Sequence, residues 1–362
     1  MQAFPITLGG SGGGQRAPAP PNNVLILFIP MPRMTPTLQQ PIGLVGLGLL
    51  GRGIASCLLA QGLKVVAYSR SEATRRRSLP GIADALRGLV KRGLVPAARV
   101  HGWRQRFQPV ASLSELARCR FLIESVKEEF DLKRTIFEEL EDIVSADTVI
   151  ASNTSSLPIS ALQTGLKHPE RVVGMHWGEP AHILRYLEII PGRRTSPRTL
   201  QRTQRLARRC GKEPTMLNED IRGFLSNRMM YAMIREAFHL VEAGIADLET
   251  VDRSFRNDIG WWSLLAGPFR WMDLTGIPAY ALVMEELLPE LSTAKHIPAL
   301  MRSVAGSGAK GIANARGFYP YTKRSARRWG KKWVEFTYDV RKLADKYAAL
   351  SAPDDRPRRK ER

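Results

Sequence analysis

Cysteine is scarce in this 362-residue sequence, which also lacks any apolar run long enough to cross a bilayer. The cysteines, Cys57, Cys119 and Cys210, are far apart and fit neither a metal-binding spacing nor a disulfide framework. We therefore expect buried thiols, no bound metal and a reducing compartment, the cytoplasm. A membrane-spanning helix needs about 20 apolar residues. The best candidate, 24–30, is far shorter, so no membrane partner is expected.

Acidic residues are also scarce, since 34 Asp and Glu face 54 Lys and Arg, and the net charge is +20. Residues 321–362 hold fourteen basic and six acidic residues, and 193–212 holds eight basic residues and no acid. Such a surface attracts anions in general. No zinc-finger spacing, recognition-helix signature or RNA-binding aromatic motif accompanies it. Nucleic acid is therefore not the expected partner, although binding through the basic tail is an alternative that deletion of 321–362 would test.

Three glycines dominate the first ordered part of the chain. Gly46, Gly48 and Gly51 have the spacing G-x-G-x-x-G, directly after the apolar run 42–45 and at the start of a helical pattern. Such glycines permit a tight turn, close approach of a pyrophosphate, and close packing of helix on strand. The helix N-terminus adds a partial positive charge for the phosphates. With a second strand at 64–68, the motif predicts a dinucleotide site rather than a structural glycine loop.

The chain divides into four parts by pattern. Residues 1–40, rich in Gly, Pro and Gln, are expected to be a disordered leader. Strands and helices alternate over 41–219, which predicts a Rossmann-type, doubly wound parallel sheet. Helical segments over 220–321 predict an all-α C-terminal domain, and 322–362 is expected to be a basic helical extension and tail. The expected strands are 42–45, 64–68, 121–126, 148–152, 172–176, 187–190 and 213–217, and the longer helices are 49–61, 72–92, 131–143, 224–242 and 329–350.

Polar residues follow the strands of this α/β unit where the carboxyl ends of parallel strands meet, which is the usual ligand edge. They are Glu124, the run 152–156 and His176. With these features the sequence resembles the 3-hydroxyacyl-CoA dehydrogenase family over 41–321. The matching stretches are 46–53, 124–133, 152–157, 174–176, 223–228, 267–269 with Asp273, 308–311 and 317–321. The resemblance implies an NAD-linked oxidoreductase of fatty acid metabolism, with an acyl-CoA substrate and a homodimer formed through the helical domain.

The resemblance also assigns roles. It makes His176 the catalytic base and Glu188 its partner, while Ser155 and Asn227 position the substrate oxygen. The chemistry agrees, because alcohol oxidation needs a base, and a carboxylate on the other ring nitrogen fixes the tautomer and stabilises the imidazolium. The positions implied to contact the cofactor are Gly46, Gly48, Leu49, Leu50, Gly51, Ser69, Arg70, Glu128, Lys133 and Asn153.

The sequence departs from the family pattern in three places. Glu179 stands where an Asn is usual, which adds a carboxylate near His176 and indicates either a changed pKa of His176 or a different substrate. Arg222 replaces a Pro before the Gly-Phe motif. Ser69, followed by Arg70, occupies the position where NAD sites carry an acid for the ribose 2′-hydroxyl. Without that acid, and with an arginine beside it, NADP is expected to be tolerated as well as NAD.

Two other functions stay open. A related dehydrogenase of a small free 3-hydroxy acid would use the same His176 and Glu188. A non-catalytic dinucleotide-binding protein is the other alternative, with Glu179 as a sign of a decayed site. The complete set of expected catalytic residues argues against the latter.

Overall fold

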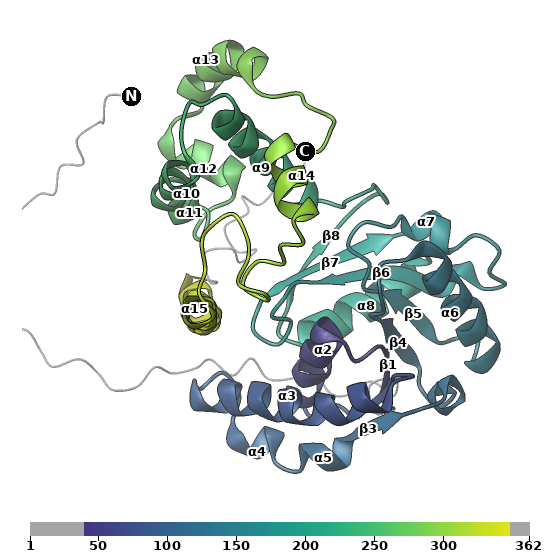
Figure 1. Ribbon diagram of the computed structural model, residues 1–362. Coiled ribbons are helices and arrows are strands. Elements are labelled where there is room, and N and C mark those ends of the chain that lie inside the picture. Colours follow the sequence, from purple (N-terminus) through teal and green to yellow (C-terminus); the bar gives the residue numbers. More distant parts are fainter. Residues whose placement is uncertain (1–39, 348–362) are drawn as a thin grey trace, which may run out of the picture. The chain divides into compact units, whose positions relative to one another are not determined.

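A computed structural model describes residues 40–347 (Figure 1). The expected leader, apart from its last residue, and positions 348–362 of the expected tail lie outside the described residues. Within 40–347 no helix is both long enough and apolar enough to serve as a membrane span.

The described strands form one eight-stranded sheet in the order β3-β2-β1-β4-β5-β6-β7-β8. The strands are β1 (Ile42–Val45), β2 (Val65–Tyr68), β3 (Phe107–Val110), β4 (Phe121–Glu124), β5 (Val149–Ser152), β6 (Val172–Trp177), β7 (Tyr186–Pro191) and β8 (Glu213–Met216). All neighbours are parallel except β6 and β7, which are antiparallel. The predicted doubly wound, mostly parallel sheet is confirmed.

Strand β3 is the one strand of this sheet that the sequence did not predict. It is only four residues long, carries Pro109 and has a mixed burial pattern. Proline cannot donate a ladder hydrogen bond and is tolerated on edge strands. Because β3 lies at the end of the strand order, pairing only with β2, the proline is compatible with the sheet.

Both faces of the sheet are covered by helices, and alternate strand residues enter two separate cores (Figure 1). On one face, Leu44 packs in a cluster with Ile54 and Ile82. On the other face, Val45 shares a cluster with Phe137. The helices of this part are α2 (Leu49–Ala60), α3 (Glu72–Lys91), α4 (Ala97–Val100), α5 (Trp103–Arg106), α6 (Phe130–Ile143), α7 (Ile159–Leu162) and α8 (Pro197–Arg209), with short 3-10 turns η1 (Leu113–Leu116) and η2 (Pro169–Arg171). Burial on both faces explains the continuously apolar strands.

The chain after β8 is helical, as predicted. It contains α9 (Ser226–Glu242), α10 (Leu248–Asn257), α11 (Ile259–Trp262), α12 (Pro268–Thr275), α13 (Ile277–Leu287), η3 (Leu288–Glu290), α14 (Ala299–Gly306) and α15 (Lys323–Tyr347). Helix α9 begins two residues later than expected, because Gly223 and Phe224 both have positive φ angles, 79° and 53°. Helix α15 begins six residues earlier than expected and buries Tyr338 in the core beside α2 and α3.

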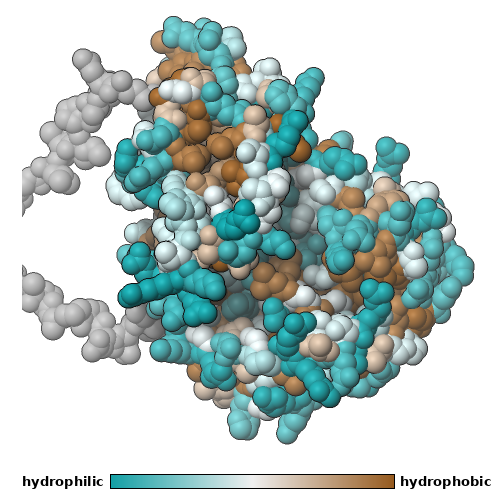
Figure 2. Space-filling model, in the orientation of Figure 1, coloured by the Kyte–Doolittle hydropathy of each residue, from teal (hydrophilic) through white to brown (hydrophobic). Residues whose placement is uncertain are grey.

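Helices α9 to α14 contain no buried residue, although many of their side chains are large and apolar. Trp261 is 81% exposed and Phe269 is 79% exposed. Figure 2 shows apolar side chains gathered over this helical part of the chain. Large exposed apolar patches usually mark interaction sites.

Candidate active site

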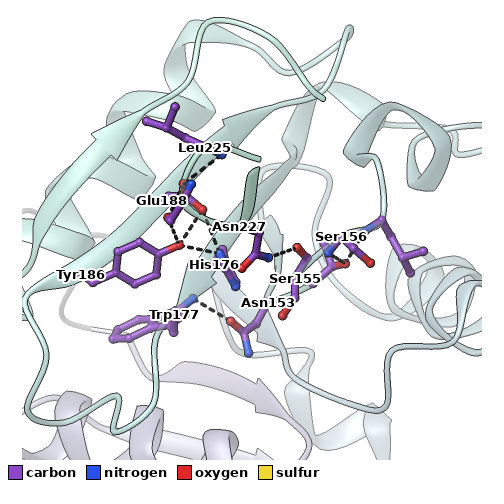
Figure 3. Close-up of polar contacts among 12 residues, drawn as sticks. Asn153, Ser155, Ser156, His176, Trp177, Tyr186, Glu188, Leu225 and Asn227 are labelled. Carbon is purple, nitrogen blue, oxygen red and sulfur yellow. Dashed lines mark hydrogen bonds and ion pairs between the residues drawn. The ribbon is translucent and has the colours of Figure 1, made fainter. Parts of the chain in front are cut away.

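His176 and Glu188 face each other across the antiparallel pair of β6 and β7 (Figure 3). They are direct partners in the strand register, so their side chains leave the same face of the sheet. The Nδ1 atom of His176 lies 2.9 Å from Oε2 of Glu188, and both side chains are at least nine-tenths buried. The one antiparallel pairing of the sheet therefore creates the dyad.

Two hydroxyl groups surround the carboxylate of this dyad. The Tyr186 hydroxyl donates to Oε2 of Glu188 over 2.6 Å and lies 2.9 Å from Nδ1 of His176. The Ser226 hydroxyl lies 2.7 Å from the Tyr186 oxygen and 2.8 Å from Oε1 of Glu188. The backbone N–H groups of Leu225 and Ser226 also donate to Oε1, over 3.2 and 2.9 Å. Both carboxylate oxygens are thus fully hydrogen-bonded (Figure 3).

This environment keeps Glu188 ionised. Burial alone would raise the pKa of Glu188, but hydrogen bonds from His176, Tyr186 and Ser226 outweigh it and lower the pKa to about 2. The pKa of Tyr186 is raised by its burial and by its hydrogen bond to Glu188, so its hydroxyl stays a donor. Because a carboxylate only accepts, Nδ1 of His176 carries the proton and Nε2 is the nitrogen able to accept one.

A second polar cluster holds the turn after β5. Glu128 accepts hydrogen bonds from the Thr154 hydroxyl (2.6 Å) and from the N–H groups of Ser155 (2.8 Å) and Ser156 (3.0 Å). Burial raises the pKa of Glu128. The Thr154 hydrogen bond, the nearby Lys133 and the two backbone N–H groups outweigh burial, so the pKa of Glu128 lies below its ordinary value. An ionised Glu128 therefore fixes the backbone that carries Ser155.

The turn meets the helical part of the chain at Asn227. The Nδ2 atom of Asn227 donates to the backbone carbonyl of Ser155 over 2.8 Å (Figure 3). The structure thus brings these two predicted residues together through the Ser155 main chain. Asn153, two residues earlier, accepts from the N–H of Trp177 over 2.8 Å, which ties the turn to the residue after His176.

An open cavity of about 740 Å³ lies at the glycine turn between β1 and α2. The expected cofactor residues that line it are Gly46, Gly48, Leu49, Leu50, Ser69, Arg70, Glu128 and Asn153, and the predicted substrate residue Ser155 also lines it. Asn153 connects the cavity to the dyad, because it lines the cavity and bonds to the strand of His176. The cavity is thus continuous with the ligand edge of the sheet.

The three glycines differ in what they allow. Gly46 has a φ of 107°, and a Cβ there would collide with the Ser125 carbonyl. A Cβ at Gly51 would collide with the Gly46 carbonyl, so Gly51 permits close packing of α2 on the turn. At Gly48 a Cβ would meet nothing within 4 Å, which leaves the backbone open to a phosphate group at the start of α2. These residues fit a bound dinucleotide.

The chain matches two family models that together span these features. The NAD-binding domain of 3-hydroxyacyl-CoA dehydrogenase matches residues 41–221, and the C-terminal domain of 3-hydroxyacyl-CoA dehydrogenase matches 223–321. The chain belongs to the 3-hydroxyacyl-CoA dehydrogenase family. It is an oxidoreductase, and its cofactor is NAD.

Among curated relatives, a 5-formyl-3-hydroxy-2-methylpyridine 4-carboxylate 5-dehydrogenase of Mesorhizobium japonicum is 33% identical over 283 residues, covering 78% of this chain and 90% of that protein. A probable 3-hydroxybutyryl-CoA dehydrogenase of Deinococcus radiodurans is 31% identical over 281 residues, covering 77% and 99%.

Solved structures give the same family. A 5-formyl-3-hydroxy-2-methylpyridine 4-carboxylic acid 5-dehydrogenase, described as an NAD+-dependent dismutase, has a TM-score of 0.80 and 30% identity, covering 84% of this chain and 98% of that chain. The (S)-3-hydroxybutyryl-CoA dehydrogenase of Ralstonia eutropha has a TM-score of 0.65 and 31% identity, covering 78% and 99%.

Lys133 differs from the expectation for this dehydrogenase. It is fully buried, is not among the residues that line the cavity, and forms ion pairs with Glu124 (2.7 Å) and Glu128 (3.4 Å). Its observed contacts orient Glu128 rather than reach into the cavity. Gly51 likewise lies behind the turn and acts through packing.

Glu179, the unusual residue beside His176, does not join the dyad. Within residues 40–347 no hydrogen bond links its carboxylate to His176. Its pKa is raised by burial, against a smaller opposite effect of the Ala181 backbone and of Arg52. The residue is exposed, so the burial of its carboxylate is only partial. Glu179 lies close to α2, because a Cβ at Gly53 would be 3.6 Å from its Oε2. The expectation of a direct effect on His176 therefore has no contact to support it.

Sequence reasoning missed Tyr186 and Ser226. Tyr186 lies two residues before Glu188 on the same strand, and residues at this spacing share one face of a sheet. That spacing was the available signal. The signal for Ser226 was weaker, because only its position next to Asn227 indicated it. Its contact with Glu188 on β7 depends on the fold.

Proposed function

We propose that this enzyme interconverts 3-hydroxyacyl-CoA and 3-oxoacyl-CoA esters, with His176 as the general base and Glu188 as its partner. The observation that carries the proposal is the buried His176–Glu188 dyad, joined through Asn153 to the dinucleotide cavity. Relatives whose names specify 3-hydroxybutyryl-CoA or 3-hydroxyadipyl-CoA dehydrogenases support this substrate class.

In the oxidative direction, Nε2 of His176 takes the proton of the substrate hydroxyl. The imidazolium that results keeps its Nδ1–H on Glu188, which is already ionised and hydrogen-bonded, so no reorganisation is needed as charge develops. NAD, when bound, supplies the hydride acceptor. Ser155 and Asn227 hold the substrate oxygen, with the Asn227 amide itself oriented by the Ser155 carbonyl.

A grid of substrates tests this assignment. Purified full-length enzyme is given NAD and, in turn, 3-hydroxybutyryl-CoA, longer 3-hydroxyacyl-CoA esters and the corresponding free acids, and reduction of the dinucleotide is measured. The proposal expects the CoA esters to give a kcat/KM at least about tenfold above the free acids, equivalent to about 1.4 kcal/mol of added binding in the transition state. Equal or better use of the free acids contradicts it.

A small free acid is the second candidate function. The observation in its favour is the likeness to the 5-formyl-3-hydroxy-2-methylpyridine 4-carboxylate 5-dehydrogenase, whose name specifies a substrate without coenzyme A. Glu179 adds to it, because the family usually has an amide there. A non-catalytic role does not fit an oxidoreductase family whose relatives are named dehydrogenases, and the hydrogen-bond network around Glu188 is complete.

We also propose a homodimer formed through the helical domain. The support is the exposed apolar surface of α9 to α14, which includes the highly exposed Trp261 and Phe269. Burying such surface against a second copy is favourable by about 25 cal/mol per Å².

The domain boundaries and the cellular location are also proposals. The domain division is proposed at 41–219 for the dinucleotide-binding domain, 220–321 for the helical domain, and 322–362 for the extension. A cytoplasmic enzyme of fatty acid metabolism fits the unpaired, buried cysteines and the family's substrate class.

A further inference from the structure

The end of β2 forms one wall of the dinucleotide cavity. Ser69, Arg70, Ser71 and Thr74 all line it there. In an NAD site this strand end carries a carboxylate that accepts hydrogen bonds from the adenosine ribose. Here the position is Ser69, and the next residue is Arg70. We propose that this end of the cavity binds a phosphate on the ribose 2′-oxygen, so that the enzyme takes NADP as well as NAD.

Within residues 40–347, neither the end of β2 nor the start of α3 places a carboxylate in the cavity. Glu128 and Glu139 are the acidic residues that line the cavity within the described part of the chain. Glu128 is occupied by Thr154 and the turn that carries Ser155. Glu139 also lines the cavity, but it belongs to α6 and not to β2 or the start of α3. Glu72, close to Ser69 in the chain, is paired with Arg76 at 2.6 Å on the surface.

Two arginines, Arg70 and Arg75, lie at the end of β2, where an NAD site would carry a carboxylate. The guanidinium of Arg75 donates to the carbonyl oxygens of Ser69 and Arg70, the latter over 3.1 Å, and so fixes the loop after β2. Arg70 is exposed, and its guanidinium has no ion pair or hydrogen bond with another residue of 40–347. It is therefore available to a ligand in the cavity. An arginine can bind a phosphate through two parallel N–H groups.

The start of α3 adds a third contribution. Ser71 caps this 20-residue helix by accepting from the N–H of Thr74 over 3.2 Å. The first N–H groups of the helix have no partner within it, and the helix dipole favours an anion at this end. Ser71 and Thr74 line the cavity, so the helix begins at its wall. A loop with two arginines, two serines and a helix N-terminus therefore attracts a doubly charged phosphate. An acidic residue at the end of the strand would repel it.

A nucleotide-binding experiment tests this proposal without any acyl substrate. NADPH and NADH are titrated into the full-length enzyme, and the dissociation constants are measured from nicotinamide fluorescence. The proposal expects NADPH to bind no more than about threefold more weakly than NADH, which is under 1 kcal/mol. Weaker binding of NADPH than this contradicts it. The result is independent of the proposed acyl-CoA substrate, because only the dinucleotide is added.

Three variants locate the phosphate contact. Arg70→Ala is expected to lose about tenfold or more in NADPH affinity, as expected for one charge-assisted hydrogen bond, with NADH changed less than about twofold. Ser69→Asp is expected to weaken NADPH by at least as much while keeping NADH. Arg77→Ala is the matched control and is expected to change neither, since Arg77 lies on α3, is absent from the cavity lining and donates to the Ala73 carbonyl within 40–347. Equal losses for both nucleotides in Arg70→Ala would overturn the assignment.

Discussion

At the scale of single residues, the candidate active site depends on how Glu188 is held. A buried carboxylate is costly unless it is fully hydrogen-bonded, and here His176, Tyr186, Ser226 and two backbone N–H groups satisfy it. The sequence predicted the His176–Glu188 pair through a resemblance and a chemical argument. Tyr186 was not predicted, because a tyrosine on a strand does not by itself indicate a catalytic role. Only the pairing of β6 and β7 places its hydroxyl beside the dyad.

Replacement of Glu188 is expected to change how stability depends on pH. The pKa of Glu188 falls from its ordinary 4.5 to about 2 in the folded protein. A depressed carboxyl pKa contributes stability above the ordinary value, which is lost as the pH falls from about 4.5 to about 2. In urea unfolding, the stability advantage of the wild type over Glu188→Gln should therefore shrink across this window. A constant difference between the two proteins would show that Glu188 is not ionised in the folded state.

Tyr186→Phe is expected to raise the pKa of Glu188. The Tyr186 hydroxyl donates to Oε2 of Glu188, and this hydrogen bond is one of the contacts that lower the carboxyl pKa. Without it burial is opposed less, so the stability that Glu188 contributes should be lost at a higher pH than in the wild type. Urea unfolding across the acid range measures this, and Tyr280→Phe, whose hydroxyl contacts Thr275 within 40–347, is the control. Loss of stability at the wild-type pH would make Tyr186 a packing residue only.

At the scale of elements, the glycine turn and the antiparallel β6–β7 pair make the site. The turn was predictable, because its spacing follows from backbone geometry at Gly46, Gly48 and Gly51. The short edge strand Phe107–Val110 was not, since Pro109 argues against a strand unless the edge position is known. The α9 start was also misplaced, because left-handed Phe224 depends on its burial in the tertiary core.

Two alanine variants separate the tasks of the turn. Gly46→Ala forces a Cβ onto the Ser125 carbonyl at a φ of 107°, and should destabilise the protein by about 1–3 kcal/mol. Gly48→Ala has space for its Cβ, so thermal stability should be close to wild type. Its dinucleotide affinity should nevertheless fall, because the methyl group occupies the open side of the turn. Equal melting temperatures for both variants would contradict this division.

At the scale of the whole molecule, the helical part exposes many large apolar side chains, and we propose that a second copy of the chain covers them. The sequence predicted its helices, but the extent of its exposed apolar surface depends on how they pack. A basic helical extension was expected within 322–362, and α15 is a helix there; its Tyr338 enters the core, with its ring 4.4 Å from the Arg92 guanidinium. This helix is therefore part of the folded structure, whatever else its basic face binds.

A charge placed in the apolar surface should separate the proposed dimer. Trp261→Asp combined with Phe269→Asp is expected to shift the mass measured by light scattering from dimer to monomer. The conservative pair Trp261→Phe and Phe269→Leu should keep the dimer, since it preserves apolar area. A wild-type protein that is monomeric at micromolar concentration would contradict the dimer itself, without affecting the dyad.

The central claim is that His176, held by Glu188, is the base of an NAD-dependent alcohol oxidation. The most direct measurement compares His176→Ala with His168→Ala, whose histidine pairs with Glu170 at 3.4 Å on the surface. With 3-hydroxybutyryl-CoA and NAD, His176→Ala should lose about 10²- to 10⁴-fold in kcat while its NADH dissociation constant stays close to wild type. His168→Ala should keep full activity. Turnover by His176→Ala close to the wild-type rate would contradict the account.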